Sequence, residues 1–142
     1  MKYPIGIQSF DRIIENGYVY VDKTDLIYQL AQEGSIYFLS RPRRFGKSLL
    51  VSTLEHYFLG HKELFKGLKI DQLEKDWHVY PVFHVDFNGS NFTQAGVLEE
   101  RLEDYVSDWE TRYGLTSEAD RLDVGGRFIK VLRAAHEQTG RR

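Results

Sequence analysis

The stretch SRPRRFGKSLL at positions 40–50 contains residues whose types and spacing suit the binding of a polyphosphate. Gly46, Lys47 and Ser48 match the last three fixed positions of the P-loop pattern G-x-x-x-x-G-K-[ST]. In that pattern the glycine lets the backbone approach the phosphates, the lysine spans the β- and γ-phosphates, and the hydroxyl ligates Mg²⁺. These three residues predict a site for ATP and Mg²⁺, with Ser48 as the metal ligand.

The front of this loop departs from the pattern, because Arg41 stands where the first glycine belongs. Arginine enters a left-handed backbone conformation less readily than glycine, and Pro42 has no N–H to donate, so we expect a modified phosphate cradle. The alternative is a plain basic turn that begins a helix. A lysine at a helix N-terminus opposes the helix dipole, which speaks against that alternative.

Three arginines in the loop, Arg41, Arg43 and Arg44, admit three interpretations. A guanidinium holds phosphate oxygens in a bidentate fork, so additional phosphate contacts are the first. A patch for nucleic acid is the second, and a solvated turn is the third. The sequence leaves all three open.

The elements around the loop have the order that a phosphate-binding loop requires. SIYFLS at 35–40 has the β-branched and aromatic composition of a strand and leads directly into the loop. After Gly46, apolar residues recur at three and four, which predicts a helix of about three turns that ends near Gly60. We therefore expect strand, loop and helix in succession.

Further patterns predict the rest of an α/β fold. Residues 18–24 (YVYVDKT) and 80–87 (YPVFHVDF) indicate two more strands, the second a buried strand of a parallel sheet. Helical spacing and glycine stops predict helices at 9–17 and 24–34, and Thr24 is expected to cap the second. The same signals predict a short helix within 61–79, a long helix from 92 to 114 and a last helix around 128–135. The expected architecture is a P-loop NTPase-like parallel sheet flanked by helices, in an incomplete domain, because no closing strand follows the last helix.

Composition limits the function. Lys and Arg number 19 against 21 Asp and Glu, a net charge of −2, so the whole chain has no electrostatic footprint for nucleic acid and any basic site is local. The sequence contains no cysteine, which excludes disulfides and thiolate metal sites. No segment has the apolar length of a signal peptide or of a membrane span, so we expect a cytoplasmic protein without a membrane partner, and an oligomer stays possible.

Other candidate residues have ordinary structural interpretations. His56 and His61 are expected to be surface or packing residues rather than metal ligands, and His84 is expected in the core. Asp86 ends the strand at 80–87 and is either a loop cap or a metal ligand. The pair at 22–23 (DK) is interpreted as a polar strand end rather than a nuclease motif. The stripe formed by Tyr105 and Trp109 has helical spacing and is assigned to the core.

YVDKT at 20–24, FLSRPRRFGKSLL at 38–50 and YPVFHVDF at 80–87 together resemble the AAA-ATPase-like family of bacterial proteins. The resemblance spans nearly the whole chain and includes the arginine-bearing loop without its first glycine. It implies a P-loop ATPase fold, in parents that often carry a carboxy-terminal domain resembling PD-(D/E)XK nucleases. By this resemblance, residues 1–142 are expected to be the N-terminal portion of a single domain. In the family an acidic Walker B-type strand follows, and the Asp-Glu pair of that strand is absent from this chain.

The resemblance assigns the phosphate contact to Lys47 and the Mg²⁺ contact to Ser48. The nucleotide site that we expect consists of Arg43, Arg44, Phe45, Gly46, Lys47, Ser48 and Leu49. ATP binding is the leading function, with hydrolysis expected of the full-length parent and not of this chain alone. Two alternatives stay open: a nucleic-acid-binding module that uses the arginine loop, and a protein-interaction domain with a degenerate nucleotide site.

Overall fold

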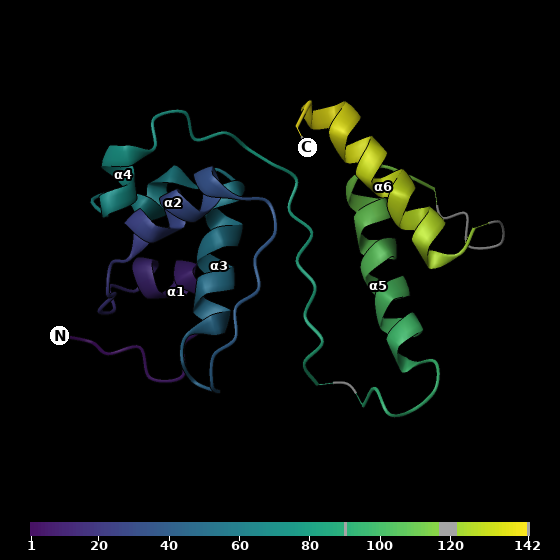
Figure 1. Ribbon diagram of the computed structural model, residues 1–142, viewed down its shortest axis with the longest axis horizontal. Coiled ribbons are helices and arrows are strands. Elements are labelled where there is room, and N and C mark those ends of the chain that lie inside the picture. The colour runs from purple at the N-terminus through teal and green to yellow at the C-terminus, as the bar shows by residue number, and fades with distance from the viewer. Residues whose placement is uncertain (90, 117–121, 142) are drawn as a thin grey trace. The chain divides into compact units, whose positions relative to one another are not determined.

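A computed structural model describes residues 1–89, 91–116 and 122–141. The described elements in chain order are α1 (Phe10–Glu15), α2 (Thr24–Glu33), α3 (Lys47–Phe58), the short 3₁₀ helix η1 (Lys62–Phe65), α4 (Lys69–Leu73), α5 (Val97–Arg112) and α6 (Val124–Thr139) (Figure 1). The chain divides into two compact units, Met1–Val82 and Phe83–Arg142. The first unit contains the stretch at 40–50 together with α1 to α4.

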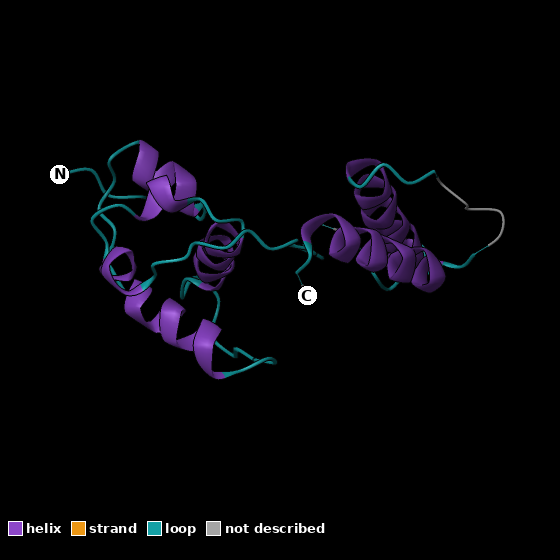
Figure 2. Ribbon diagram, turned by 90° about the horizontal axis from the view of Figure 1, so that it is seen from above, coloured by secondary structure: helices purple, strands orange, loops and turns teal. Residues whose placement is uncertain are grey.

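The expected parallel sheet is wrong for the part of the chain that the structure describes. Residues 18–24, 35–40 and 80–87 form no strand there, and Figure 2 shows helices and loops only. An isolated parallel bridge joins Lys2 to Tyr18. Composition reports how well a segment would suit a pleated surface, but a strand also needs a neighbour for its N–H and C=O groups. Ile36 and Phe38 are 92% and 93% exposed, so the apolar residues at 35–40 are not covered as strand residues would be.

Helix positions in the first unit agree with the periodicity of the sequence. The helices expected at 9–17, 24–34 and from 46 to 60 are α1, α2 and α3. Gly60 follows α3 with a φ of 73°, a left-handed conformation that glycine adopts without strain. The short helix expected within 61–79 is present as α4, with η1 before it.

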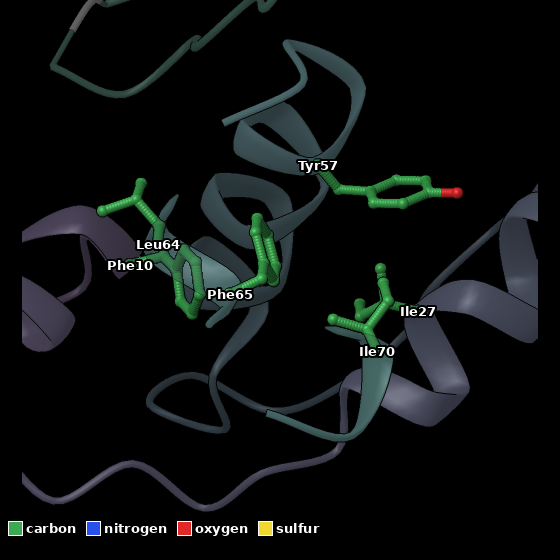
Figure 3. Close-up of a cluster of buried hydrophobic side chains, with 6 residues drawn as sticks. All are labelled: Phe10, Ile27, Tyr57, Leu64, Phe65 and Ile70. Atoms are coloured by element: carbon green, nitrogen blue, oxygen red, sulfur yellow. The ribbon is translucent and has the colours of Figure 1, made fainter. Parts of the chain in front are cut away.

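Six buried side chains form the core of the first unit, and Figure 3 shows them from several elements: Phe10, Ile27, Tyr57, Leu64, Phe65 and Ile70. The rings of Phe10 and Phe65 lie 4.7 Å apart between centroids. Burying each large apolar side chain stabilises the fold by roughly 1.5–3 kcal/mol. Amphipathic helices too short to be stable alone are therefore held together by this shared core.

A polar connection joins α2 to α4 across 46 or 47 residues of sequence. Asp22 accepts hydrogen bonds from the amide and hydroxyl of Thr24 at 3.0 and 2.6 Å and from the amide of Lys69 at 2.8 Å. The fully buried Thr24 hydroxyl also accepts from the amide of Ile70 at 3.1 Å. The sequence had predicted that Thr24 caps its own helix, and this prediction is wrong, because none of the described side chains caps α2. Asp22 and Thr24 instead satisfy the first amides of α4.

The second unit is built on α5 and α6, which lie side by side (Figures 1 and 2). Val106, Trp109 and Val131 form its buried apolar cluster, and Phe83 packs edge to face on Trp109 at 5.0 Å. Tyr105 stacks on Trp109 with the ring centroids 5.7 Å apart, so the prediction that this stripe is core is confirmed.

A buried ion pair also joins the two helices of this unit. The Arg127 guanidinium donates to both oxygens of Glu110 at 3.0 and 2.7 Å, and to the hydroxyl of Ser107 at 2.9 Å. The two charged side chains are only 5% and 6% exposed. The hydrogen bond to Glu110 raises the pKa of Arg127. Each charge is compensated by the other, which a buried ion requires.

Candidate functional site

Two residues of the loop before α3 adopt left-handed backbone conformations. Arg44 has a φ of 66°, and Gly46, which directly precedes the helix, has a φ of 76°. Arg41, which stands where the pattern has its first glycine, is not left-handed, and the strained residue of the loop is Arg44. Left-handed residues interspersed in a turn bring successive amide groups toward one side of the backbone, the arrangement of anion-binding nests.

Lys47 closes the loop onto its own start. Its ammonium donates to the carbonyl oxygen of Arg41 at 2.7 Å, and the Arg41 guanidinium makes a longer contact of 3.4 Å with the carbonyl oxygen of Phe45. An ammonium has three N–H donors, so this contact leaves two more available to a ligand. The carbonyl of Arg41 is a partner that the sequence pattern does not reveal, because any residue at this position supplies it.

The start of α3 presents unsatisfied amides. The first backbone bond of the helix runs from Leu50 N–H to Gly46 C=O at 2.9 Å, so the amides of Lys47, Ser48 and Leu49 precede the helical ladder. Among the described residues no side chain caps this end. These amides and the helix dipole give the exposed N-terminus a partial positive charge that favours an anion.

The predicted site residues divide into exposed and anchoring side chains. Arg43, Arg44, Lys47 and Ser48 are exposed, and Phe45 is 62% exposed. Leu49 is partly buried and packs against the core cluster of the first unit, so it anchors the start of the helix. The structure thus places cationic side chains and free amides together at one helix end.

A Mg²⁺ ion would receive one protein oxygen at this end, the Ser48 hydroxyl. Within the described residues no group of three or more His, Cys, Asp or Glu side chains is placed to hold a metal ion. Mg²⁺ commonly keeps several waters and binds through substrate phosphates with few protein ligands. A Mg²⁺ ion at this end would therefore depend on water and on a bound phosphate for its other ligands, with the exposed Ser48 hydroxyl as the contribution of the protein.

Asp86 belongs to the second unit. Its carboxylate accepts a hydrogen bond from the amide of Asn88 at 2.8 Å, the contact expected of a loop cap. Its backbone amide donates to the Tyr105 hydroxyl, which in turn donates to the Asp86 carbonyl at 2.9 Å. His84, which the sequence had placed in the core, is exposed.

The two histidines near the end of α3 are packing residues, as predicted. His56 and His61 lie with their Nδ1 atoms 2.8 Å apart, a hydrogen bond in which one ring donates and the other accepts. Nε2 of His56 lies 3.6 Å from the carboxylate of Asp11. A hydrogen bond from Ser9, and then the nearby His56, lower the pKa of Asp11 although burial opposes the shift. This contact between α1 and α3 could not be anticipated, because no sequence spacing relates residue 11 to residue 56.

Comparison with known proteins gives one family. The sequence model described as "Predicted AAA-ATPase" matches residues 4–142. A protein of Azotobacter chroococcum mcd 1, named "Uncharacterized protein in vnfD 5'region", is 41% identical over 143 aligned residues, which include 99% of this chain. The chain spans 27% of that relative's length. No solved structure matches, and none of the described helices has the length and apolar character that crossing a membrane requires.

Proposed function

The chain belongs to the AAA-ATPase-like family, and on that premise we propose that it binds ATP, together with Mg²⁺, at the loop that precedes α3. The observation that carries the proposal is the convergence of uncapped amides, the Lys47 ammonium and the left-handed Gly46 at the exposed start of a 12-residue helix. Each of these groups stabilises negative charge or allows phosphate to approach closely.

Each predicted residue has a role in this proposal. Amides of residues 46–49 bind phosphate oxygens, and Lys47 adds charge-assisted hydrogen bonds with the donors that Arg41 does not occupy. Ser48 supplies its hydroxyl to Mg²⁺. Arg43 and Arg44 are exposed beside the helix start and add bidentate contacts to the outer phosphate.

Nucleotide binding is tested by calorimetric titration of Mg·ATP into the chain and its Lys47→Ala variant. Loss of one charge-assisted contact should weaken binding about 10- to 100-fold. Exposed Lys66, on the same unit but outside the loop, supplies the matched control Lys66→Ala, which should bind as the unchanged chain does. Equal affinity of the Lys47→Ala variant would refute the assignment.

The same titration separates the alternatives. Ser48→Ala should lower affinity in the presence of Mg²⁺ and have little effect in EDTA, because its hydroxyl acts through the metal. An oligonucleotide that bound more tightly than Mg·ATP, with a steep salt dependence, would favour a nucleic-acid module. Binding of neither would favour a protein-interaction domain with a degenerate site.

Turnover makes further demands on a site, so we propose binding rather than hydrolysis for residues 1–142. Hydrolysis needs a carboxylate in the Mg²⁺ shell and a group that orients the attacking water. We expect phosphate release from this chain to equal that of Lys47→Ala. Lys47-dependent release well above that control would show that an acid such as Asp86 completes the site, and the restriction to binding would be wrong.

A further inference from the structure

A second concave site lies in the first unit, at the opposite end of α3 from Lys47. It is a cavity of about 230 Å³ between α2, the end of α3 and the segment that follows α4. Its lining includes aromatic and acidic side chains: Tyr57, Phe58, Glu74, Asp76, Trp77 and Tyr80. Tyr57 lies ten residues beyond Lys47 on the helix, roughly 15 Å along its axis, so the cavity is separate from the proposed ATP site.

Aromatic rings form much of the wall of this cavity. The rings of Tyr57 and Trp77 meet at 69° with centroids 5.8 Å apart, and those of Phe58 and Tyr80 meet at 87° at the same separation. Phe65 also packs on the Trp77 ring, with centroids 5.2 Å apart, so neighbouring rings hold this part of the wall in place. Aromatic faces carry partial negative charge and attract cations.

Two carboxylates stand at the same cavity. Glu74 accepts from the Tyr57 hydroxyl at 2.5 Å and from the amide of Asp76 at 3.0 Å. Figure 3 shows that this hydroxyl points away from the other labelled core side chains. Burial acts to raise the pKa of Glu74, but these hydrogen bonds outweigh it and the pKa is lowered. Glu74 is therefore ionised at neutral pH, and the exposed Asp76 adds a second acid.

Positive charge does not balance these acids at the cavity. Among the described residues that line it, none is lysine or arginine, and His78 is the titratable side chain there besides the acids and tyrosines. An ionised carboxylate beside electron-rich ring faces favours a cationic ligand over a neutral or anionic one.

Trp77 combines an unpaired buried donor with a strained backbone. Its indole Nε1 is buried and has no hydrogen-bond partner among the described residues. Its φ of 44° lies in the left-handed region, where a bulky residue is strained. Buried donors without partners and strained backbone both concentrate at binding sites.

We propose that this cavity binds a small organic ammonium ion. The aromatic rings and the two carboxylates hold the cation. The volume suits a ligand of few heavy atoms, smaller than a nucleotide. The site works independently of the loop at Lys47.

Choline is a suitable probe, because it combines a trimethylammonium group with a nearby hydroxyl. Its neutral isostere 3,3-dimethylbutan-1-ol has the same shape without the charge, and tetramethylammonium has the charge without the hydroxyl. The chain contains two tryptophans, so the Trp109→Phe background leaves Trp77 as the reporter of fluorescence at the cavity. Calorimetry on the unchanged chain supplies a second, independent measurement.

Choline should change Trp77 emission saturably and bind about tenfold more tightly than the neutral isostere. Tetramethylammonium should also bind more tightly than the neutral isostere, because it carries the charge. Asp76→Asn should weaken choline binding several-fold, roughly 3- to 10-fold for one partly solvated charge. The matched control Glu63→Gln, an exposed acid outside the cavity, should bind choline unchanged.

Lys47→Ala should bind choline as the unchanged chain does, which keeps this test distinct from that of ATP binding. The proposal is overturned if choline and its neutral isostere bind with equal affinity, or if neither gives a saturable signal in fluorescence and calorimetry. It is also overturned if Asp76→Asn and Glu63→Gln have the same effect, since the acids of the cavity would then have no specific part.

Discussion

Replacing Asp22 by alanine should destabilise the first unit more than any exposed acid of that unit does. The Asp22 carboxylate accepts the amide and hydroxyl of Thr24 and the amide of Lys69, and so connects the start of α2 to the start of α4. Helix α4 has five residues and cannot form by its own propensity. Its position depends on partners from elsewhere in the chain, of which Asp22 is one.

The expected loss is roughly 2–3 kcal/mol in the free energy of unfolding. Hydrogen bonds to a charged acceptor contribute about 1.5–3 kcal/mol each when they are protected from water. Those of Asp22 are part-buried or exposed, so water replaces much of the loss, and each helix cap is worth about 1 kcal/mol. Asp22→Asn keeps one acceptor oxygen and should cost about half as much.

Urea unfolding followed by Trp77 fluorescence in the Trp109→Phe background measures this loss. With a slope of about 1–2 kcal/mol per molar urea, the midpoint should fall by roughly 1–3 M. Asp71→Ala is the control, because Asp71 accepts a single exposed hydrogen bond, from Gly67 at 3.1 Å. Its effect should stay below about 1 kcal/mol. Equal shifts for the two alanine variants would refute the reasoning.

The pH dependence of the Asp22 contribution has a definite sign. Burial acts to raise the pKa of Asp22, but the hydrogen bonds from Thr24 and Lys69 outweigh it, so the pKa in the folded chain is lowered. The stabilisation is then fully present above the unfolded value of about 3.9 and is lost as pH falls through the folded value. The stability difference between the unchanged chain and Asp22→Asn should therefore be constant from pH 5 to 7, within about 0.5 kcal/mol, and shrink below pH 4.

Three further predictions test other features by substitution. Glu110→Ala should destabilise the second unit by about 3–5 kcal/mol, because it leaves Arg127 charged and buried, whereas the double change to Glu110→Leu with Arg127→Met should recover most of that loss in urea unfolding. Gly60→Ala should lower the free energy of unfolding by about 1–3 kcal/mol, because the φ of Gly60 is 73° and the added methyl would lie 2.9 Å from a methyl carbon of Val79. An unchanged midpoint of urea unfolding would contradict this. Arg44→Gly should be near neutral, because relief of about 1 kcal/mol of left-handed strain offsets the entropy cost of glycine, while Arg43→Gly should lower the midpoint.

Helices were predictable because their signals are local. Leu50, Leu54 and Tyr57 repeat at the helical period after Gly46, and the described helix follows that pattern to Phe58. The position of Lys47 at the first helical residue follows from the same pattern. In the loop, however, the pattern could not locate the strain at Arg44, because backbone angles there depend on how the turn closes.

Sheet formation was not predictable, because pairing is a property of two segments. Residues 35–40 have the composition of a strand, but no strand neighbour lies beside them in the described part of the chain. The partners of Asp22 and Tyr57 were equally hidden, since Lys69 and Glu74 are 47 and 17 residues away and no spacing rule relates them. The ATP and Mg²⁺ assignments stay predictions that depend on binding measurements.

The exposed segment at 35–40 also has a consequence for solubility. Six uncharged residues without proline, with Ile36 and Phe38 almost fully exposed, have the features of a segment that can pair with a copy of itself in another molecule. Arg41, Pro42 and Arg43 follow at once, and charge and proline beside such a segment act as gatekeepers against aggregation. The basic residues at this loop thus oppose self-association as well as offering charge to a ligand, and neutralising them should make concentrated solutions of the chain less stable.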